Sequence, residues 1–282
     1  MPTKEHFIFD GYFYSTDSTS KQYVDEKGNW ITPWEYESDG TLYAHWHLDL
    51  PSLTWAMDIS SSVSSINIIR GGKNEGDRVQ MRGNRSNPGK GAAWVEWEGK
   101  DNWLRLTSIE FDYNIEQGDS FLTAGLMLNV NMSDNDRLKG YILSFNFDKQ
   151  RFNQMHNFNI SNTGSIFKFT YKKAANSNVI ENLTEISDFD AGLVGGNFGS
   201  YSRGGRYQGK VKIEIESSKY IITIMNPNGT VRNTITIDEE PSNMYPNNFG
   251  FFSEHYSHGC DEIGYFELYN IRINGTEINK WY

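Results

Sequence analysis

The chain has a single cysteine, Cys260, among its 282 residues. One thiol excludes an intrachain disulfide framework and also excludes a zinc site built on several cysteine ligands. A reactive thiol would need a neighbouring base, and the sequence does not reveal one. We therefore interpret Cys260 as a small buried or half-buried side chain.

Long apolar runs and an excess of basic residues are also missing. No apolar run approaches the roughly 18–20 residues that cross a bilayer, and Met1–Glu5 is polar, unlike a signal peptide. The formal net charge is −10, which disfavours binding to nucleic acid and to anionic membranes. We expect no nucleic-acid partner and no membrane insertion. These absences suit a cytoplasmic protein or a piece excised from a longer secreted one.

Aromatic residues, by contrast, are abundant. They make up 15% of the chain, within a hydrophobic total of 37%, which is typical of a folded protein. The core must therefore be built largely from Phe, Tyr and Trp. These residues favour β-strands and also suit faces that bind sugars.

Short strands separated by turns account for most of the chain. The clearest is Lys210–Glu216 (KVKIEIE), which alternates strictly and begins an antiparallel meander through Tyr220–Met225 and Val231–Ile237. A helix is predicted only over residues 183–190. A strand pair broken at Asp10-Gly11 is predicted over His6–Tyr14. Further predicted strands are Tyr43–Asp49, Leu106–Ile115, Phe121–Val130, Gly140–Phe147 and Ile166–Tyr171.

The segment Phe249–Ile273 closes the pattern with two aromatic strands around the polar elbow EHYSHGCDE. Repeated strands with almost no helix predict an all-β protein, either a sandwich or a jelly roll.

Four pieces of the sequence resemble the concanavalin A-like (lectin/glucanase, laminin-G-like) jelly-roll domains of Gram-positive bacterial surface proteins. They are Phe111–Val130, Gly140–Phe145, Gly209–Ile215 and Gly250–Ile273, and the resemblance covers roughly residues 90–275. It implies a jelly-roll β-sandwich of two antiparallel sheets with long loops. We expect one domain over residues 1–282, with 90–275 as the sandwich core. Residues 1–90 would supply opening strands and long loops; the alternative is a separate small module.

The resemblance also implies a function. It points to an extracellular, adhesin-like or carbohydrate-recognition module of a larger bacterial surface protein, whose signal and anchor would lie outside this sequence. Such a module would be monomeric, would need no cofactor, and would bind a glycan or a host or cell-surface protein. A glycan-acting hydrolase and a structural stalk without a ligand are the alternatives.

Aromatic and planar polar side chains in loops are the candidate ligand contacts, because sugars present apolar ring faces and hydroxyls. The elbow histidine also suits a structural hydrogen bond in a turn. Ser257 and His258 are adjacent, so on an extended chain their side chains point apart, and Cys260 shares a side with His258 but lacks an orienting group. The candidates are Trp94, Trp97, Phe198, Tyr201, Arg203, Arg206, Tyr207, Tyr256 and His258.

The hydrolase alternative depends on Glu110 and Asp112, which lie on one side of a strand together with Glu116. Glu110 and Glu116 would be about 20 Å apart, too far for a catalytic pair, so only Glu110 and Asp112 approach the required spacing. A solvated strand face and polar ligand contacts are the other interpretations of this stretch.

Two stretches suggest metal binding. Asp134, Asn135 and Asp136 group oxygen ligands in one turn, as a calcium site requires, although a solvated Asx turn has the same composition. His45 and His47 point to one side of their strand, but no third ligand is near them in sequence.

Overall fold

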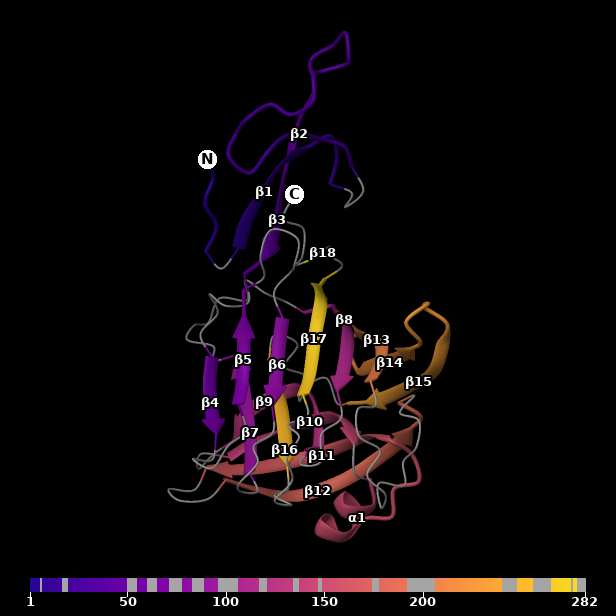
Figure 1. Ribbon diagram of the computed structural model, residues 1–282. Coiled ribbons are helices and arrows are strands. Elements are labelled where there is room, and N and C mark those ends of the chain that lie inside the picture. Colours follow the sequence, from indigo (N-terminus) through magenta and orange to yellow (C-terminus); the bar gives the residue numbers. More distant parts are fainter. Residues whose placement is uncertain are drawn as a thin grey trace.

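The structure is a computed structural model, and most of its described residues lie in β-strands (Figure 1). It describes residues 1–5, 7–16, 20–49, 55–59, 65–70, 78–82, 89–95, 106–116, 121–133, 137–146, 149–173, 178–191, 206–239, 248–255, 265–274 and 276–277. Among these residues, no helix is long and apolar enough to cross a membrane.

Two antiparallel sheets form the body of the molecule. The seven-stranded sheet has the order β12-β11-β10-β9-β16-β7-β4: Asn178–Phe189, Gly164–Lys173, Arg137–Asn146, Phe121–Ser133, Phe249–His255, Gly89–Val95 and Trp55–Ile59. The eight-stranded sheet has the order β15-β14-β13-β8-β17-β6-β5: Val231–Asp238, Lys219–Met225, Arg206–Ile215, Ser108–Glu116, Tyr265–Ile273, Arg78–Arg82 and Ser65–Ile69. Its last strand, β18 (Thr276–Glu277), pairs with β17. The predicted two-sheet, all-β architecture is confirmed.

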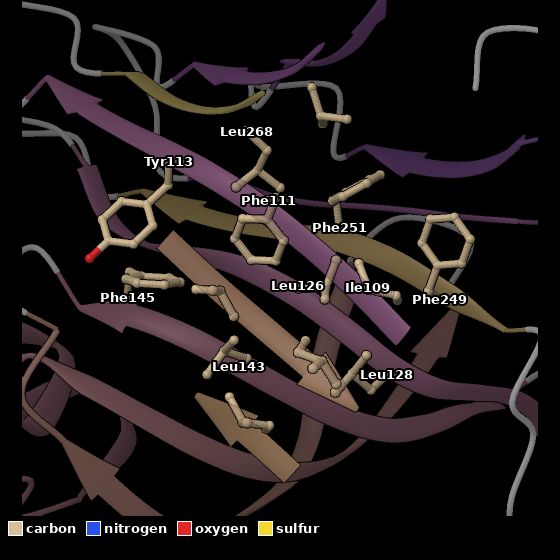
Figure 2. Packing of buried hydrophobic residues seen from close by; sticks show 14 of the residues in the cluster. Ile109, Phe111, Tyr113, Leu126, Leu128, Leu143, Phe145, Phe249, Phe251 and Leu268 are labelled. Carbon is tan, nitrogen blue, oxygen red and sulfur yellow. The ribbon is translucent and has the colours of Figure 1, made fainter. Parts of the chain in front are cut away.

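Strict alternation explains why these sequences form a sandwich. Along β8, every second residue is buried, from Ile109 through Tyr113 to Ile115, while the residues between them are half-exposed. The inward side chains of both sheets form one cluster, in which Phe111, Leu126 and Phe251 lie together (Figure 2). The alternation of each strand therefore builds an apolar core on one side and a polar surface on the other.

The closing strands lie in different sheets. β16 lies between β9 and β7 in the seven-stranded sheet, whereas β17 lies between β8 and β6 in the eight-stranded sheet. The chain thus crosses the sandwich between two strands that follow each other in sequence. The predicted meander is confirmed as β13-β14-β15, with Val211, Ile213 and Ile222 buried.

Two local predictions are wrong. Residues 183–190 are not helical, because β12 pairs antiparallel with β11 along its length, and the helix of the described chain is α1, Lys149–His156. The β-branched residues Val179, Ile180 and Thr184 suit that strand. Gly11 does not break a strand pair either. It lies at a bulge within the continuous strand β1, Phe7–Phe13, with a φ of 127°.

The first 49 residues build a separate sheet. β1 lies between β2 (Gln22–Val24) and β3 (Tyr43–Leu48) in a three-stranded sheet beyond one end of the sandwich (Figure 1). Phe7 packs against the sandwich core, and β4 to β7 supply strands to both large sheets. The opening strands of the sandwich therefore come from residues 55–95. A single domain over the whole chain stays a prediction.

Tyr113 shows how tightly the core is fitted. Its ring lies over Gly209, where an added Cβ would come within 2.3 Å of the hydroxyl, and the hydroxyl donates a hydrogen bond to the Ala191 carbonyl at 2.9 Å. Burial raises the pKa of Tyr113 to about 12 and also raises the pKa of Tyr220.

We predict a loss of stability in alkali that depends on Tyr113. Its pKa is near 10 in the unfolded chain and about 12 in the fold, so the stabilisation is complete below pH 10 and declines as the pH rises toward 12. For one group, the free energy of unfolding changes with pH by at most about 1.4 kcal/mol per pH unit. Urea unfolding followed by circular dichroism measures the free energy of unfolding at pH 8 and pH 11. Between these pH values, Tyr113→Phe should lose less of it than the unchanged protein. Tyr43→Phe, on an exposed ring, serves as the control; an unchanged slope in Tyr113→Phe would contradict the assignment.

Candidate functional site

Three of the nine predicted ligand contacts lie in described strands, and the structure places Trp94 in a different sheet from Arg206 and Tyr207. Trp94 in β7 is half-buried on the outer face of the seven-stranded sheet, where it packs against a cluster that includes Phe252. Tyr207 in β13 is partly buried against the sandwich core. Arg206 begins β13.

The other predicted contacts lie outside the described residues and stay predictions. They are Trp97, Phe198, Tyr201, Arg203, Tyr256 and His258, and the same holds for the calcium ligands Asp134, Asn135 and Asp136. His45, from the possible metal pair, stacks on Phe13 with ring centroids 4.0 Å apart, and its Nε2 lies 2.7 Å from the Ser15 carbonyl oxygen. No group of three or more His, Cys, Asp or Glu that could hold a metal ion occurs within the described ranges.

The outer face of the eight-stranded sheet gathers aromatic and planar polar side chains from three adjacent strands. We call this surface the tyrosine face. Each of its members is half-buried, because it alternates with a buried residue of the core. Its members are Tyr265, Glu267 and Tyr269 of β17, Asp112, Asn114 and Glu116 of β8, and Gln80 of β6.

Strand pairing fixes the positions of these side chains. Tyr265 lies opposite Glu116 and Glu267 lies opposite Asn114 in the β17–β8 ladder, and Gln80 lies opposite Glu267 on the other side. Directly opposed residues of an antiparallel pair have Cβ atoms about 4.5–5.5 Å apart. The tyrosine face is therefore continuous across the three strands.

Hydrogen bonds order the middle of the tyrosine face. Asn114 Nδ2 donates to the Tyr265 hydroxyl at 3.3 Å, and Gln80 Nε2 donates to Glu267 Oε1 at 3.5 Å. The other amide atom of the asparagine, Oδ1, is buried and accepts no hydrogen bond from the described residues. A buried acceptor without a donor is unfavourable, and a ligand hydroxyl would reach this atom only if the amide turned outward.

Both tyrosine hydroxyls on this face remain protonated well into alkali. Burial is the main cause that raises the pKa of Tyr265, and the hydrogen bond with Glu116 adds to it. Burial also raises the pKa of Tyr269, followed by the negative charges of Asp112 and Glu267. At neutral pH each hydroxyl can therefore donate and accept a hydrogen bond.

Glu110 and Asp112 do lie on one side of β8, as the alternation predicts, and cations accompany both. Lys210 Nζ lies 3.5 Å from Asp112 Oδ1, and Asn270 Nδ2 donates to Asp112 Oδ2 at 2.8 Å. Arg272 Nη1 lies 3.8 Å from Glu110 Oε2. With 29% and 18% of their side chains exposed, these carboxylates form surface ion pairs. The hydrolase alternative stays a prediction.

A bulge lets Asn270 reach that carboxylate. The pairing of β17 with β8 shifts between Tyr269 and Arg272, and Asn270 has a left-handed φ of 50°. Asparagine tolerates this conformation better than most residues. The sequence analysis missed Tyr265 and Tyr269, although the alternation of YFELY already placed both on one side of their strand.

A second polar group lies on the outer face of the seven-stranded sheet, and it is buried. Ser144 Oγ and Thr123 Oγ1 donate to Asn146 Oδ1 at 2.8 and 3.1 Å, and Asn146 Nδ2 donates to Ser165 Oγ at 3.0 Å. Every one of these side chains is at most 1% exposed. These side chains hydrogen-bond to one another, and this internal pairing accounts for their burial.

Beside this group, a buried hydrogen bond fastens α1 to the sheet. Glu254 lies opposite Thr123 and is 1% exposed, and its Oε2 lies 3.0 Å from His156 Nε2 at the end of α1. Phe152 of the same helix packs on Phe167 of β11. The helix is thus held on the sheet by both an apolar and a polar contact.

We predict that His156→Ala destabilises the fold by on the order of 3 kcal/mol, because breaking a buried pair leaves a buried carboxylate with less compensation. The measurement is urea unfolding at neutral pH, with Gln154→Ala on an exposed position of α1 as the matched control. Alanine has a higher helix propensity than histidine, so His156→Ala would raise the stability if the pair contributed nothing. That result would contradict the prediction.

Comparisons with known proteins give a general likeness to lectin-type sandwiches. No family model matches the sequence, and no curated protein matches it. A structure of peanut lectin is 10% identical over 77% of this chain and 92% of the lectin, with a TM-score of 0.37. A Lotus tetragonolobus seed lectin is 8% identical over 77% and 94%, also with a TM-score of 0.37. A structure of botulinum neurotoxin type C is 12% identical and covers 84% of this chain but only 46% of the toxin chain, with a TM-score of 0.36. At these low scores, the strand order described above remains the basis of the fold assignment.

Proposed function

We propose that the protein is a carbohydrate-binding β-sandwich and that a neutral saccharide lies along the tyrosine face. The observation that carries this proposal is the placement of Tyr265 and Tyr269 on one outer side of β17. Four residues along a strand separate them by about 13 Å, so the two rings can contact different residues of one oligosaccharide.

The groups between the two rings suit hydroxyl recognition. Asn114, Gln80 and Glu267 offer planar amides and a carboxylate. A saccharide presents apolar C–H faces to aromatic rings and many hydroxyls to such planar groups. Rings and polar groups on one ordered sheet provide both kinds of contact without a large ordering cost.

Charge pairing favours a neutral ligand over an anionic one. Arg78 Nε lies 3.5 Å from Glu267 Oε1, and Lys210 lies beside Asp112, so cations and carboxylates offset each other on this face. A ligand with several negative charges would meet the uncompensated net charge of −10 of the whole chain.

In its wider setting, we propose a monomeric, extracellular module of adhesin or carbohydrate-recognition type, within a larger bacterial surface protein. The asparagine-rich, cysteine-poor composition suits this setting. A surface glycan is the expected ligand, and a host or cell-surface protein is the second candidate partner.

We predict that Tyr269→Ala and Asn114→Ala each weaken saccharide binding about tenfold or more, since about 1.4 kcal/mol of lost contact is a factor of ten. The measurement is retardation in native gels that contain a mixed-linkage β-glucan, a galactomannan, a xyloglucan or glycogen. Thr223→Ala, an outward-facing residue of β14 in the same sheet, is the matched control.

Two results bear against this proposal. Unchanged retardation of both variants, with the fold verified by circular dichroism, would show that saccharide binds elsewhere. Equal weakening in Thr223→Ala would show that the effect comes from the sheet as a whole and not from the tyrosine face.

A further inference from the structure

We propose a second saccharide-binding surface beside the three-stranded sheet, made by Tyr14 just after β1 and by Trp34 and Tyr36 between β2 and β3, which we call the aromatic shelf. The inference takes its ligand class from the proposed function but depends on different residues. No residue of the aromatic shelf is shared with the tyrosine face, and the shelf lies in segments that connect strands of a different sheet.

Exposed apolar side chains concentrate in this small part of the molecule. Of the eight large hydrophobic residues exposed among the described ones, five lie between residues 14 and 43: Tyr14, Trp30, Ile31, Tyr36 and Tyr43. Tyr14 is 44% exposed and Tyr36 is 46% exposed. Scattered exposed aromatics need no explanation, but a contiguous group marks a surface that binds something.

The rings are contiguous. Tyr14 and Tyr36 stack with centroids 5.0 Å apart and planes 21° apart, and a hydrogen bond between their hydroxyls raises the pKa of Tyr14. Trp34 stands edge-on to Tyr36, with centroids 5.2 Å apart and planes at 63°. Two nearly parallel rings with a third ring behind them leave an outer aromatic face toward solvent.

The support beneath the aromatic shelf is fixed by packing. Trp34 lies 5.2 Å from the fully buried ring of Tyr23, and its indole N–H donates to the Ser38 carbonyl at 3.0 Å. The indole ring also lies directly on Gly40, where a Cβ would come within 2.4 Å of ring carbons. A surface held in place before the ligand arrives loses little entropy on binding.

Charges beside the rings indicate a neutral ligand. Lys21 Nζ lies 2.5 Å from Glu35 Oε1 and 5.7 Å from the Tyr23 ring centroid. The ammonium group also interacts with Tyr36, so a positive charge already lies beside the aromatic shelf, which disfavours a cationic ligand. Glu35 offsets the same charge, which disfavours a phosphate. Aromatic rings with a charge-balanced polar rim suit the C–H face and hydroxyls of a neutral saccharide.

Two separate surfaces would make the protein bivalent toward a long polysaccharide. Binding at a second site on the same polymer is intramolecular, so overall retention can exceed either single affinity by about 10²–10⁴. Short oligosaccharides that reach only one surface would show no such gain.

The experiment combines affinity gels and calorimetry on the full chain. Retardation is measured with the polysaccharides named above, and titration calorimetry uses a short oligosaccharide cut from the polymer that retards the protein. Two variants test the aromatic shelf: the single variant Tyr14→Ala and the double variant Tyr14→Ala/Tyr36→Ala. Tyr269→Ala tests the tyrosine face. Tyr43→Ala, an exposed tyrosine of the same small sheet, is the control.

We expect the double variant to lose at least about tenfold in retention on the polymer, and its calorimetric stoichiometry to fall from two sites to one. Tyr14→Ala alone should give an intermediate loss and keep Trp34 in place. Tyr43→Ala should behave as the unchanged protein.

Different outcomes separate the two proposals. One site in the unchanged protein, with no effect of the shelf variants, overturns the second surface and leaves the tyrosine face standing. Retention that survives Tyr269→Ala but is lost in the double variant overturns the tyrosine face alone. Retention by none of the polymers contradicts both. A concentration-dependent mass that only the shelf variants abolish would identify the shelf as a contact between copies of the chain, and overturns saccharide binding there.

Discussion

The structure depends on the in-and-out alternation of its strands across a close-packed aromatic interior. Tyr113 contacts Phe145 of the opposite sheet with ring centroids 4.8 Å apart, and Phe145 lies 5.2 Å from Phe266. Rings at these separations leave no space for a shift of register. A slip of one residue along β8 would turn each buried ring outward and place carboxylates in the core, which is far too costly to persist.

That constraint positions the candidate site as well. The outward residues of β8 and β17 have fixed spacing because the inward residues of the same strands are locked in the core. Asn274 reinforces this arrangement: its side-chain oxygen accepts a hydrogen bond from the Thr107 backbone N–H at 2.6 Å and so ties the end of β17 to the start of β8. The tyrosine face is therefore ordered by buried residues that lie behind it in the core.

The sequence predicted those features that depend on local residue patterns and missed those that depend on contacts between distant residues. The meander from β13 to β15 and the outward side of β8 come from local alternation, and both were predicted. The strand β12 was mistaken for a helix because LTEISDFD lacks strict alternation, and only pairing with β11 settles its state. The aromatic shelf was missed because Tyr14 meets Trp34 and Tyr36 through a turn-rich stretch without any period. Contacts of this kind arise from tertiary structure, which no residue pattern in that segment encodes.

The division of each strand into buried and outward positions has an evolutionary consequence. Along β17, Phe266 and Leu268 build the core, while Tyr265, Glu267 and Tyr269 alternate with them on the surface. Substitutions at the second set can accumulate under selection for a new target while the first set stays unchanged. Descendants of such a chain would keep one scaffold and diverge in what they recognise, and sequence similarity between them would fade first at every second residue.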